Sequence, residues 1–273
     1  MHNLKNLPLG KASAFKDQYD SSLLFPIART PHRQNMGINI NTLPFKGFDI
    51  WNAYEVSWLN VKGKPEVRIC QIILFCNSEF LIESKSLKLY LNSYSGTKFS
   101  SAREVEKQIA ADLSSATNSK VMVTLIDLDI KQEISKPSGV CIDEQDIEIP
   151  KFEKPSSSEL KILNEFRTET LYSELMKSNC PVTGQPDWAT VMVTYSGQQI
   201  DPAGLLRYII SFRNCNELHE ECVERIFCDI MEHCKPEELT VYARYTRRGG
   251  IDINPIRSTR DINTPVNLRF IRQ

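Results

Sequence analysis

Hydrophobic residues along this chain follow two spacings, and the change between them separates predicted strands from predicted helices. Apolar and polar residues alternate over 48–58 and 67–75, on either side of the turn Lys62-Gly-Lys-Pro65, which predicts a β-hairpin. Over 83–94 the apolar residues instead recur at i, i+3, i+4 and i+7, the spacing of one helical face. The chain therefore begins its first folded region with two strands and a helix.

A second helix is predicted directly after the first. Ser100 and Ser101 are good N-cap residues, and the apolar residues that follow them have helical spacing. The chain then returns to an apolar strand over 121–126. The inward face of this second helix is predicted to carry Val105, Ile109 and Leu113.

The second half of the chain repeats the pattern of the first half at an offset of 118 residues. At this offset Tyr90 matches Tyr208, and the apolar runs of four elements coincide without a gap, placing Val105 on Val223. An ungapped register over several elements indicates an internal repeat. We therefore predict an α+β fold built by tandem duplication of a β-β-α-α-β-β unit.

Composition divides the chain into four regions. Residues 1–45 are polar and broken by prolines, which predicts an extended arm, and 46–130 form the first repeat. Residues 131–160 are rich in serine, proline and acidic residues, as expected of a surface linker. The second repeat occupies 161–273, and residues that differ between the repeats are expected to contribute different parts of one site.

Charge and hydropathy exclude several classes of partner. The formal net charge of −1 gives no electrostatic reason to bind nucleic acid or a membrane surface. No apolar run has the length of a signal peptide core or a membrane span, so we expect a cytoplasmic protein. Eight cysteines at irregular spacing, with no Cys-x-x-Cys pair, indicate reduced thiols and no disulfide framework.

The loop predicted over 178–188 is the first candidate for chemistry. Two prolines and a glycine exclude a helix there, and an alternating apolar strand follows at once. Cys180 is the candidate nucleophile, and Asp187 is its candidate proton partner. The alternative is a simple turn with an incidental buried thiol.

A helix predicted over 217–234 supplies the second candidate. His219 lies at the head of its apolar face, one turn before Cys222, and is therefore predicted to point inward. An inward histidine is often only a core residue, but the adjacent Glu220 favours a functional role because burying two ionisable groups is costly.

Three motifs together resemble one enzyme family. They are Glu83-Ser-Lys-Ser-Leu-Lys-Leu-Tyr90, Cys180-x-x-Thr-x-Gln-Pro-Asp187 and His219-Glu220. They resemble the QueF family, the NADPH-dependent 7-cyano-7-deazaguanine reductases of queuosine (tRNA modification) biosynthesis, in its long tandem-repeat form. The resemblance implies two tunnelling-fold (T-fold) repeats, a homodimer, and reduction of a nitrile to a primary amine. Leu218 departs from the phenylalanine usual before His-Glu, which affects pocket packing rather than chemistry.

The resemblance also implies roles for individual residues. Cys180 adds to the nitrile as a thiolate to form a thioimide, and Asp187 supplies a proton, which requires its protonated form. NADPH then supplies two hydrides, and no metal or nucleic acid partner is implied. The substrate-binding residues implied by the family are Ile82, Glu83, Ser84, His219 and Glu220, and the cofactor-binding residues are Ser84, Lys85, Arg248 and Gly249.

The residues alone leave the cofactor site open. No Gly-x-Gly-x-x-Gly follows a strand, so a Rossmann fold is not indicated. The segment Arg247-Arg-Gly-Gly250 combines guanidinium groups with accessible backbone, which suits a phosphate, although taken alone it is most often a hairpin turn.

Two other functions compete with this interpretation. A zinc-dependent, cyclohydrolase-like enzyme of the same fold would use His219, Cys222 and Cys180 as ligands. A non-catalytic module would only bind a purine or pterin. Cys222 also has a hypothetical redox role, since it would form a protective disulfide with an oxidised Cys180, and its alternative is simple core packing.

Overall fold

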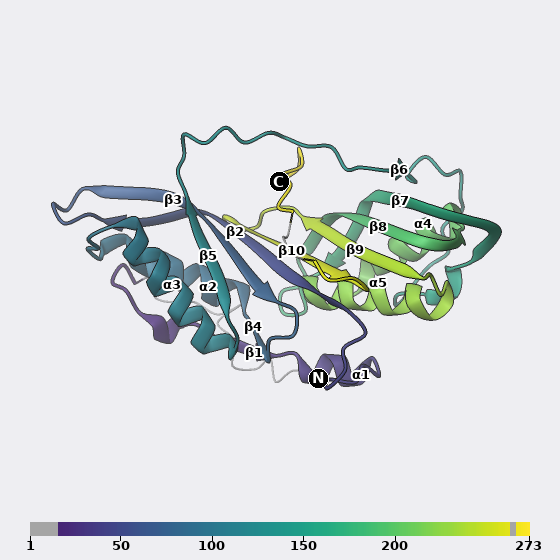
Figure 1. Ribbon diagram of the computed structural model, residues 1–273, viewed down its shortest axis with the longest axis horizontal. Coiled ribbons are helices and arrows are strands. Elements are labelled where there is room, and N and C mark those ends of the chain that lie inside the picture. Colours follow the sequence, from purple (N-terminus) through teal and green to yellow (C-terminus); the bar gives the residue numbers. More distant parts are fainter. Residues whose placement is uncertain (1–15, 263–265) are drawn as a thin grey trace. The chain divides into compact units, whose positions relative to one another are not determined.

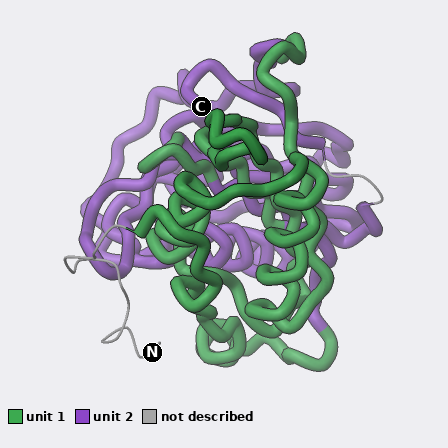
Figure 2. Tube along the Cα trace, turned by 90° about the vertical axis from the view of Figure 1, so that its left-hand side faces the viewer, with its two compact units in different colours: residues 1–42, 49–132, 247–252 green, residues 43–48, 133–246, 253–273 purple. Residues whose placement is uncertain are grey.

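The computed structural model describes residues 16–262 and 266–273, so the first part of the predicted arm lies outside the described residues. The chain divides into two compact units (Figure 2). Unit 1 comprises Met1–Thr42, described from residue 16, together with Asp49–Gln132 and Arg247–Asp252. Unit 2 comprises Leu43–Phe48, Glu133–Thr246 and Ile253–Gln273.

Unit 1 contains the predicted hairpin, the two predicted helices and the strand that follows them. β3 and β5 pair antiparallel from Ile69↔Ile126 to Leu74↔Val121, and α3 packs against β5 (Figure 1). The 121–126 strand is confirmed with the predicted bounds. The elements are β1 (Pro26–Ala28), α1 (Thr30–Asn35), β2 (Lys46–Leu59), β3 (Pro65–Phe75), β4 (Phe80–Ile82), α2 (Ser84–Asn92), α3 (Ala102–Thr117) and β5 (Val121–Ile126), with 3₁₀ turns η2 (Ser21–Leu23) and η3 (Ser93–Gly96).

Unit 2 holds a sheet in the order β10-β9-β8-β7-β6. All its neighbours pair antiparallel except β6 and β7, and α4 and α5 contact β7 and β9 respectively. The elements are β6 (Val140–Cys141), β7 (Ile162–Asn179), β8 (Pro186–Ile200), α4 (Pro202–Ile210), α5 (His219–His233), β9 (Glu238–Tyr245) and β10 (Ile251–Ser258), with 3₁₀ turns η4 (Ser157–Glu159) and η5 (Ser211–Asn214). The predicted α+β class with antiparallel strands is therefore confirmed.

The arm predicted over 1–45 does not stay extended where the structure describes it. The Tyr19 hydroxyl donates to Asp112 at 2.8 Å, and β1 pairs with β4. Arg29, 4% exposed, forms an ion pair of 2.5 Å with the fully buried Asp49. The prolines that break this segment into short pieces do not prevent Tyr19 from packing or Arg29 from being buried, so residues 16–42 pack as part of unit 1, and residues 43–45 belong to unit 2.

The duplication is visible in matched polar contacts within each unit. Glu83 caps α2 with its carboxylate, and Asp201 caps α4 in the same way at the predicted offset. Tyr90 donates to Asp112 at 2.6 Å, and Tyr208 donates to Asp229 at 2.6 Å. The repeats therefore retain both a helix cap and a buried tyrosine–carboxylate contact.

Two features of the predicted repeat are wrong in detail. The matched residues Asp112 and Asp229 are offset by 117 positions in the sequence. The N-caps of α3 and α5, Ser101 and Leu218, have the same offset of 117. The connection between the helices is thus one residue shorter in the second repeat, so Val105 corresponds to Cys222 and not to Val223. In addition, unit 2 has all six predicted elements, whereas β5 of unit 1 leads into the 131–160 linker without a matching last strand.

Helix α5 is held in unit 2 by a buried ion pair. Glu224 accepts from Arg257 Nε at 3.1 Å and from its terminal nitrogen at 2.8 Å, and both residues are nearly inaccessible. Arg257 also donates to the backbone carbonyl of Phe48 at 3.1 Å. The predicted inward face of α5 is confirmed, since Cys222, Val223, Ile226 and Ile230 are fully buried.

Within the described residues no helix has the length and apolar character needed to cross a membrane.

Removing one partner of the Glu224–Arg257 pair should destabilise the protein strongly. Glu224→Ala leaves a buried guanidinium without its carboxylate, which typically costs about 3–5 kcal/mol in the free energy of unfolding. Replacing both residues by apolar ones, as in Glu224→Leu with Arg257→Met, should cost much less. Denaturant unfolding of each variant measures this difference.

The matched control is the exposed pair of Arg260 and Glu238, whose side chains are 71% and 38% accessible. Arg260→Ala should change the unfolding free energy by less than about 1 kcal/mol. Equal effects of Glu224→Ala and Arg260→Ala would show that the buried pair does not anchor α5.

Candidate active site

The loop that carries Cys180 is a tight connection between β7 and β8. The Cys180 N–H donates to the Gln185 carbonyl at 2.8 Å, and the Gly184 N–H donates back to the Cys180 carbonyl at 3.0 Å. Gly184 has φ +68°, a conformation that side-chain-bearing residues rarely adopt. The loop is shorter than the predicted 178–188, because Asn179 and Pro186 already pair as strand residues. These bonds hold Cys180 at a defined position, with the residue only 4% exposed.

Asp187 and His219 meet in unit 2. Asp187 pairs with Ser178 at the start of β8 and is 5% exposed. The His219 Nε2 atom lies 3.4 Å from Asp187 Oδ2, and the His219 side chain is 13% exposed. The prediction that His219 points inward is therefore confirmed, and it contacts the carboxylate proposed as the proton source.

Tyr245 fixes the orientation of the His219 ring. The two rings stack with centroids 3.8 Å apart and planes inclined by 6°. Burial raises the pKa of Tyr245 well above its ordinary value, and the charges of Cys222 and Asp187 act in the same direction, so the phenol stays neutral. Sequence reasoning missed Tyr245, because all the positions near the end of β9 are apolar or buried and none is singled out by the pattern.

The start of α5 gathers carboxylates beside His219. Glu220 is 3% exposed in the first turn, where the helix dipole favours negative charge. Glu221 accepts from the N–H of Leu218 at 3.0 Å and so helps to start the helix. His219 Nδ1 is buried and has no hydrogen-bond partner among the residues that the structure describes. The histidine is thus held by its other nitrogen and by its stacked face.

The Glu83 motif lies at the start of α2 in unit 1. The Glu83 carboxylate accepts from the N–H groups of Lys85 at 2.9 Å and Ser86 at 2.7 Å, and the residue is 4% exposed. Ile82, also 4% exposed, precedes it at the end of β4. Glu83 therefore caps the helix, and Ser84 and Lys85 form the first helical turn.

The turn that carries Arg248 and Gly249 also belongs to unit 1. Arg247 lies over the ring of Tyr54, with 4.2 Å between the guanidinium carbon and the ring centroid. Gly249 has φ +65°, and a Cβ atom built on it would lie 2.8 Å from Lys88 Nζ. The absence of a side chain at Gly249 therefore lets the ammonium group approach the backbone of the turn.

A cleft of about 280 Å³ lies beside this turn. Lys88 lines the cleft and was not among the predicted site residues, although it stands three residues after Lys85 on the same helix. The complete lining comprises Ala53, Glu55, Lys88, Leu91, Asn92, Gly249, Gly250 and Ile251.

The alternative zinc ligands are not assembled as predicted. Among the described residues, the cluster of potential ligands that includes Cys222 consists of Cys215, Glu217 and Cys222, and it contains neither Cys180 nor His219. All eight cysteines are free thiols, as the sequence predicts.

Comparison with known proteins identifies the family. A model for nitrile reductase, the N-terminal part of 7-cyano-7-deazaguanine reductase, matches residues 15–125, and a model for QueF-like protein matches residues 186–264. A protein named NADPH-dependent 7-cyano-7-deazaguanine reductase from Dechloromonas aromatica is 52% identical over 268 residues, covering 97% of this chain and 95% of that relative. One with the same name from Cupriavidus pinatubonensis is 51% identical, covering 97% and 98%.

A solved structure of the archaeosine synthase QueF-Like in the apo form aligns with 38% of this chain and 96% of that chain, at 17% identity and a TM-score of 0.31, which is too low to bear on the fold. The relatives, in contrast, share about half of their residues with this chain over nearly their full length. Together with the two family models, this similarity shows that the chain belongs to the 7-cyano-7-deazaguanine reductase (QueF) family.

Proposed function

We propose that this protein reduces the nitrile of 7-cyano-7-deazaguanine to 7-aminomethyl-7-deazaguanine with NADPH, as a step in queuosine biosynthesis. The names of its relatives support the substrate and the cofactor. One structural observation supports the chemistry: Asp187 lies on the same hairpin as Cys180, and His219 contacts Asp187 at 3.4 Å. A nucleophile, a carboxyl group and an imidazole are the groups that a covalent nitrile reduction requires.

The first step assigned to Cys180 is addition to the nitrile. Its thiolate forms a bond to the nitrile carbon, one π bond of the C≡N group breaks with its electron pair moving to nitrogen, and the nitrogen takes a proton from Asp187. The product is a thioimide, R–C(=NH)–S–Cys180. Because a free thiol is only ~3% ionised at pH 7, transfer of the thiol proton to the Asp187–His219 pair prepares both the nucleophile and the acid.

The Asp187–His219 pair is also assigned the proton transfers of the two reduction steps. When bound, NADPH supplies a hydride to carbon in each of two reductions, the first expelling the Cys180 thiolate and the second completing the amine. Each reduction leaves negative charge on nitrogen or sulfur, and the Asp187–His219 contact provides a proton where that charge develops. The burial of Cys180 and Asp187 limits water, which protects the thioimide and the imine from hydrolysis.

Recognition of the purine-like edge is assigned to carboxylates. Glu220 and Glu83 accept N–H groups of the deazaguanine, with Ile82, Ser84 and His219 as further contacts. Glu83 uses two hydrogen bonds to cap α2, and a carboxylate offers roughly four acceptor positions. Its cap therefore fixes the carboxylate and leaves acceptor capacity for a ligand.

The turn of Arg248 and Gly249 fits a phosphate-bearing cofactor. Ser84, Lys85, Arg248 and Gly249 are the predicted contacts, and Lys88 joins them because it lies against Gly249 beside the 280 Å³ cleft. Bare backbone flanked by cations is a common way to hold phosphate groups.

The remaining assignments are part of the same proposal. The protein acts in the cytoplasm as a homodimer on a small-molecule substrate, without binding nucleic acid or membranes directly. A net charge of −1 and thiols that are all free agree with this setting.

Substitution of the nucleophile should separate binding from chemistry. Cys180→Ala is expected to abolish both the covalent adduct with the nitrile and NADPH oxidation, because no thiolate remains in the hairpin. Asp187→Asn should fold normally and lose at least ~100-fold in rate, the usual scale for a general acid. Intact-protein mass spectrometry without NADPH measures the adduct. Cys141→Ala is the control, and nitrile reduction by Cys180→Ala would end the covalent mechanism.

Cofactor affinity should depend on Lys88 as well as Arg248. Each charge-assisted hydrogen bond is worth roughly 1.5–3 kcal/mol, so Lys88→Ala or Arg248→Ala should raise the KM for NADPH by about 10-fold or more. The KM for the nitrile should change far less. Lys107→Ala, an exposed lysine on α3, is the control. Equal use of NADH and NADPH by the parent protein would refute the assignment of these cations to the cofactor.

A further inference from the structure

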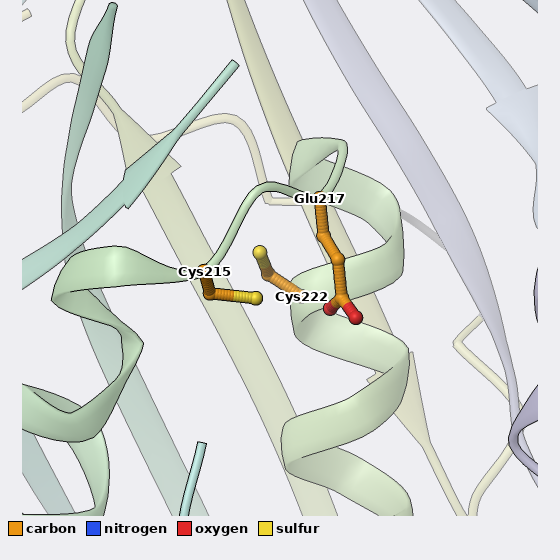
Figure 3. A group of neighbouring side chains, drawn as sticks. All are labelled: Cys215, Glu217 and Cys222. Carbon is orange, nitrogen blue, oxygen red and sulfur yellow. The ribbon is translucent and has the colours of Figure 1, made fainter. Parts of the chain in front are cut away.

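Two cysteines and a glutamate form a compact cluster at the start of α5. The Sγ atoms of Cys215 and Cys222 and a carboxylate oxygen of Glu217 all lie within 4.8 Å of one another. Figure 3 shows the three side chains converging between η5 and α5. Cys222 is fully buried and Cys215 is 6% exposed. The proposed reduction uses neither Cys215 nor Glu217.

Backbone hydrogen bonds hold this cluster in place. The Cys215 N–H donates to the Phe212 carbonyl at 2.8 Å, and the Cys215 carbonyl accepts from the Asn179 N–H at 2.8 Å. The Cys222 N–H donates to the Leu218 carbonyl at 3.0 Å in the first turn of α5. Both thiols are therefore carried by ordered backbone, so little conformational entropy is lost when they bind one ligand.

The charges of the cluster are compatible with a bound divalent cation. Cys215 and Cys222 have little access to solvent, and the Glu217 carboxylate pairs with the Arg225 guanidinium. The Arg225 guanidinium supplies one positive charge beside the cluster. Its Nε atom lies 3.1 and 3.0 Å from the two Glu217 oxygens.

With both thiols deprotonated, the cluster is electrically neutral when it holds a divalent ion. Two thiolates and one carboxylate carry three negative charges, and a divalent cation with the Arg225 guanidinium carries three positive charges. Buried charges are tolerated when they are paired and compensated in this way. Without a cation, protons on the thiols provide the compensation.

We propose that Cys215, Glu217 and Cys222 bind one zinc-class divalent cation, with a fourth position for water or another ligand. Thiolate and carboxylate ligands at about 2.3 and 2.0–2.2 Å suit Zn²⁺, which prefers tetrahedral coordination. Small side-chain movements from the present separations reach that geometry. The ion would hold the first turns of α5, one turn from His219, and is a site separate from the nitrile chemistry.

A disulfide between Cys215 and Cys222 is the competing fate of this pair. It would require a peroxide or another disulfide as oxidant, since two electrons must leave the two thiols. A disulfide makes no use of Glu217, whereas a metal ion uses all three converging groups. The cation is therefore the assignment that the geometry favours.

The test is titration of the reduced, full-length protein with Co²⁺ and Cd²⁺ as spectroscopic probes, followed by competition with Zn²⁺. We expect one equivalent of metal and a thiolate-to-metal charge-transfer absorption whose intensity corresponds to two thiolates. Cys215→Ser and Glu217→Gln should each weaken binding by about 10-fold or more, the scale seen for lost metal-site interactions. Cys228→Ser, a different thiol on α5, and Cys180→Ala should bind as the parent does.

The titration of the parent protein remains informative even if a variant folds poorly, because the intensity of the charge-transfer absorption reports the number of thiolate ligands. Stoichiometric binding with two thiolates and sensitivity to Cys215→Ser supports the proposal. It is overturned if the parent gives no thiolate signal, if Cys180→Ala abolishes binding, or if the freshly reduced protein re-forms a Cys215–Cys222 disulfide in place of taking up metal.

Discussion

The buried ion pair between Glu224 and Arg257 is the constraint on which the chemistry of unit 2 depends. It fixes α5 against β10. The first turn of α5 carries His219 and Glu220, two of the residues proposed for the active site. A shift of this helix by a fraction of a turn would separate His219 from Asp187 and from Tyr245. Charges that are costly to bury thus define one position for the helix.

The duplicated repeats keep the same structural contacts and differ at the start of the second helix of each repeat. The caps at Glu83 and Asp201 and the tyrosine–carboxylate contacts are the same in both units. The second helices differ at their starts, since Ser101 caps α3 with its side chain whereas Leu218 precedes His219 and Glu220 on α5. Helix starts offer oriented N–H groups and a favourable dipole, so functional residues can change there without altering the core.

Local pattern in the sequence predicts most of the elements and the inward side of His219. Alternation and helical spacing show which face of an element is buried. That face is visible in local sequence, as in the spacing of Val105, Ile109 and Leu113. The loop pattern made Cys180 and Asp187 candidates and the family resemblance gave them roles, and the structure shows their shared hairpin and the contact of Asp187 with His219.

Features that depend on long-range packing could not be predicted. Tyr19 and Arg29 stand in a polar, proline-broken segment, and only the folded chain supplies their polar partners Asp112 and Asp49. Lys88 approaches Gly249 across a long separation in sequence. The offset of 117 rather than 118 in the second helices was hidden because neighbouring positions on α5, Cys222 and Val223, are both apolar.

The central claim is that one active site reduces a nitrile completely to an amine. The most direct measurement is the ratio of NADPH consumed to 7-aminomethyl-7-deazaguanine formed by the purified protein from 7-cyano-7-deazaguanine. Reduction through the Cys180 thioimide predicts two NADPH for each amine, with no intermediate released. A ratio of one with an aldehyde product, or no consumption of NADPH, would contradict the account.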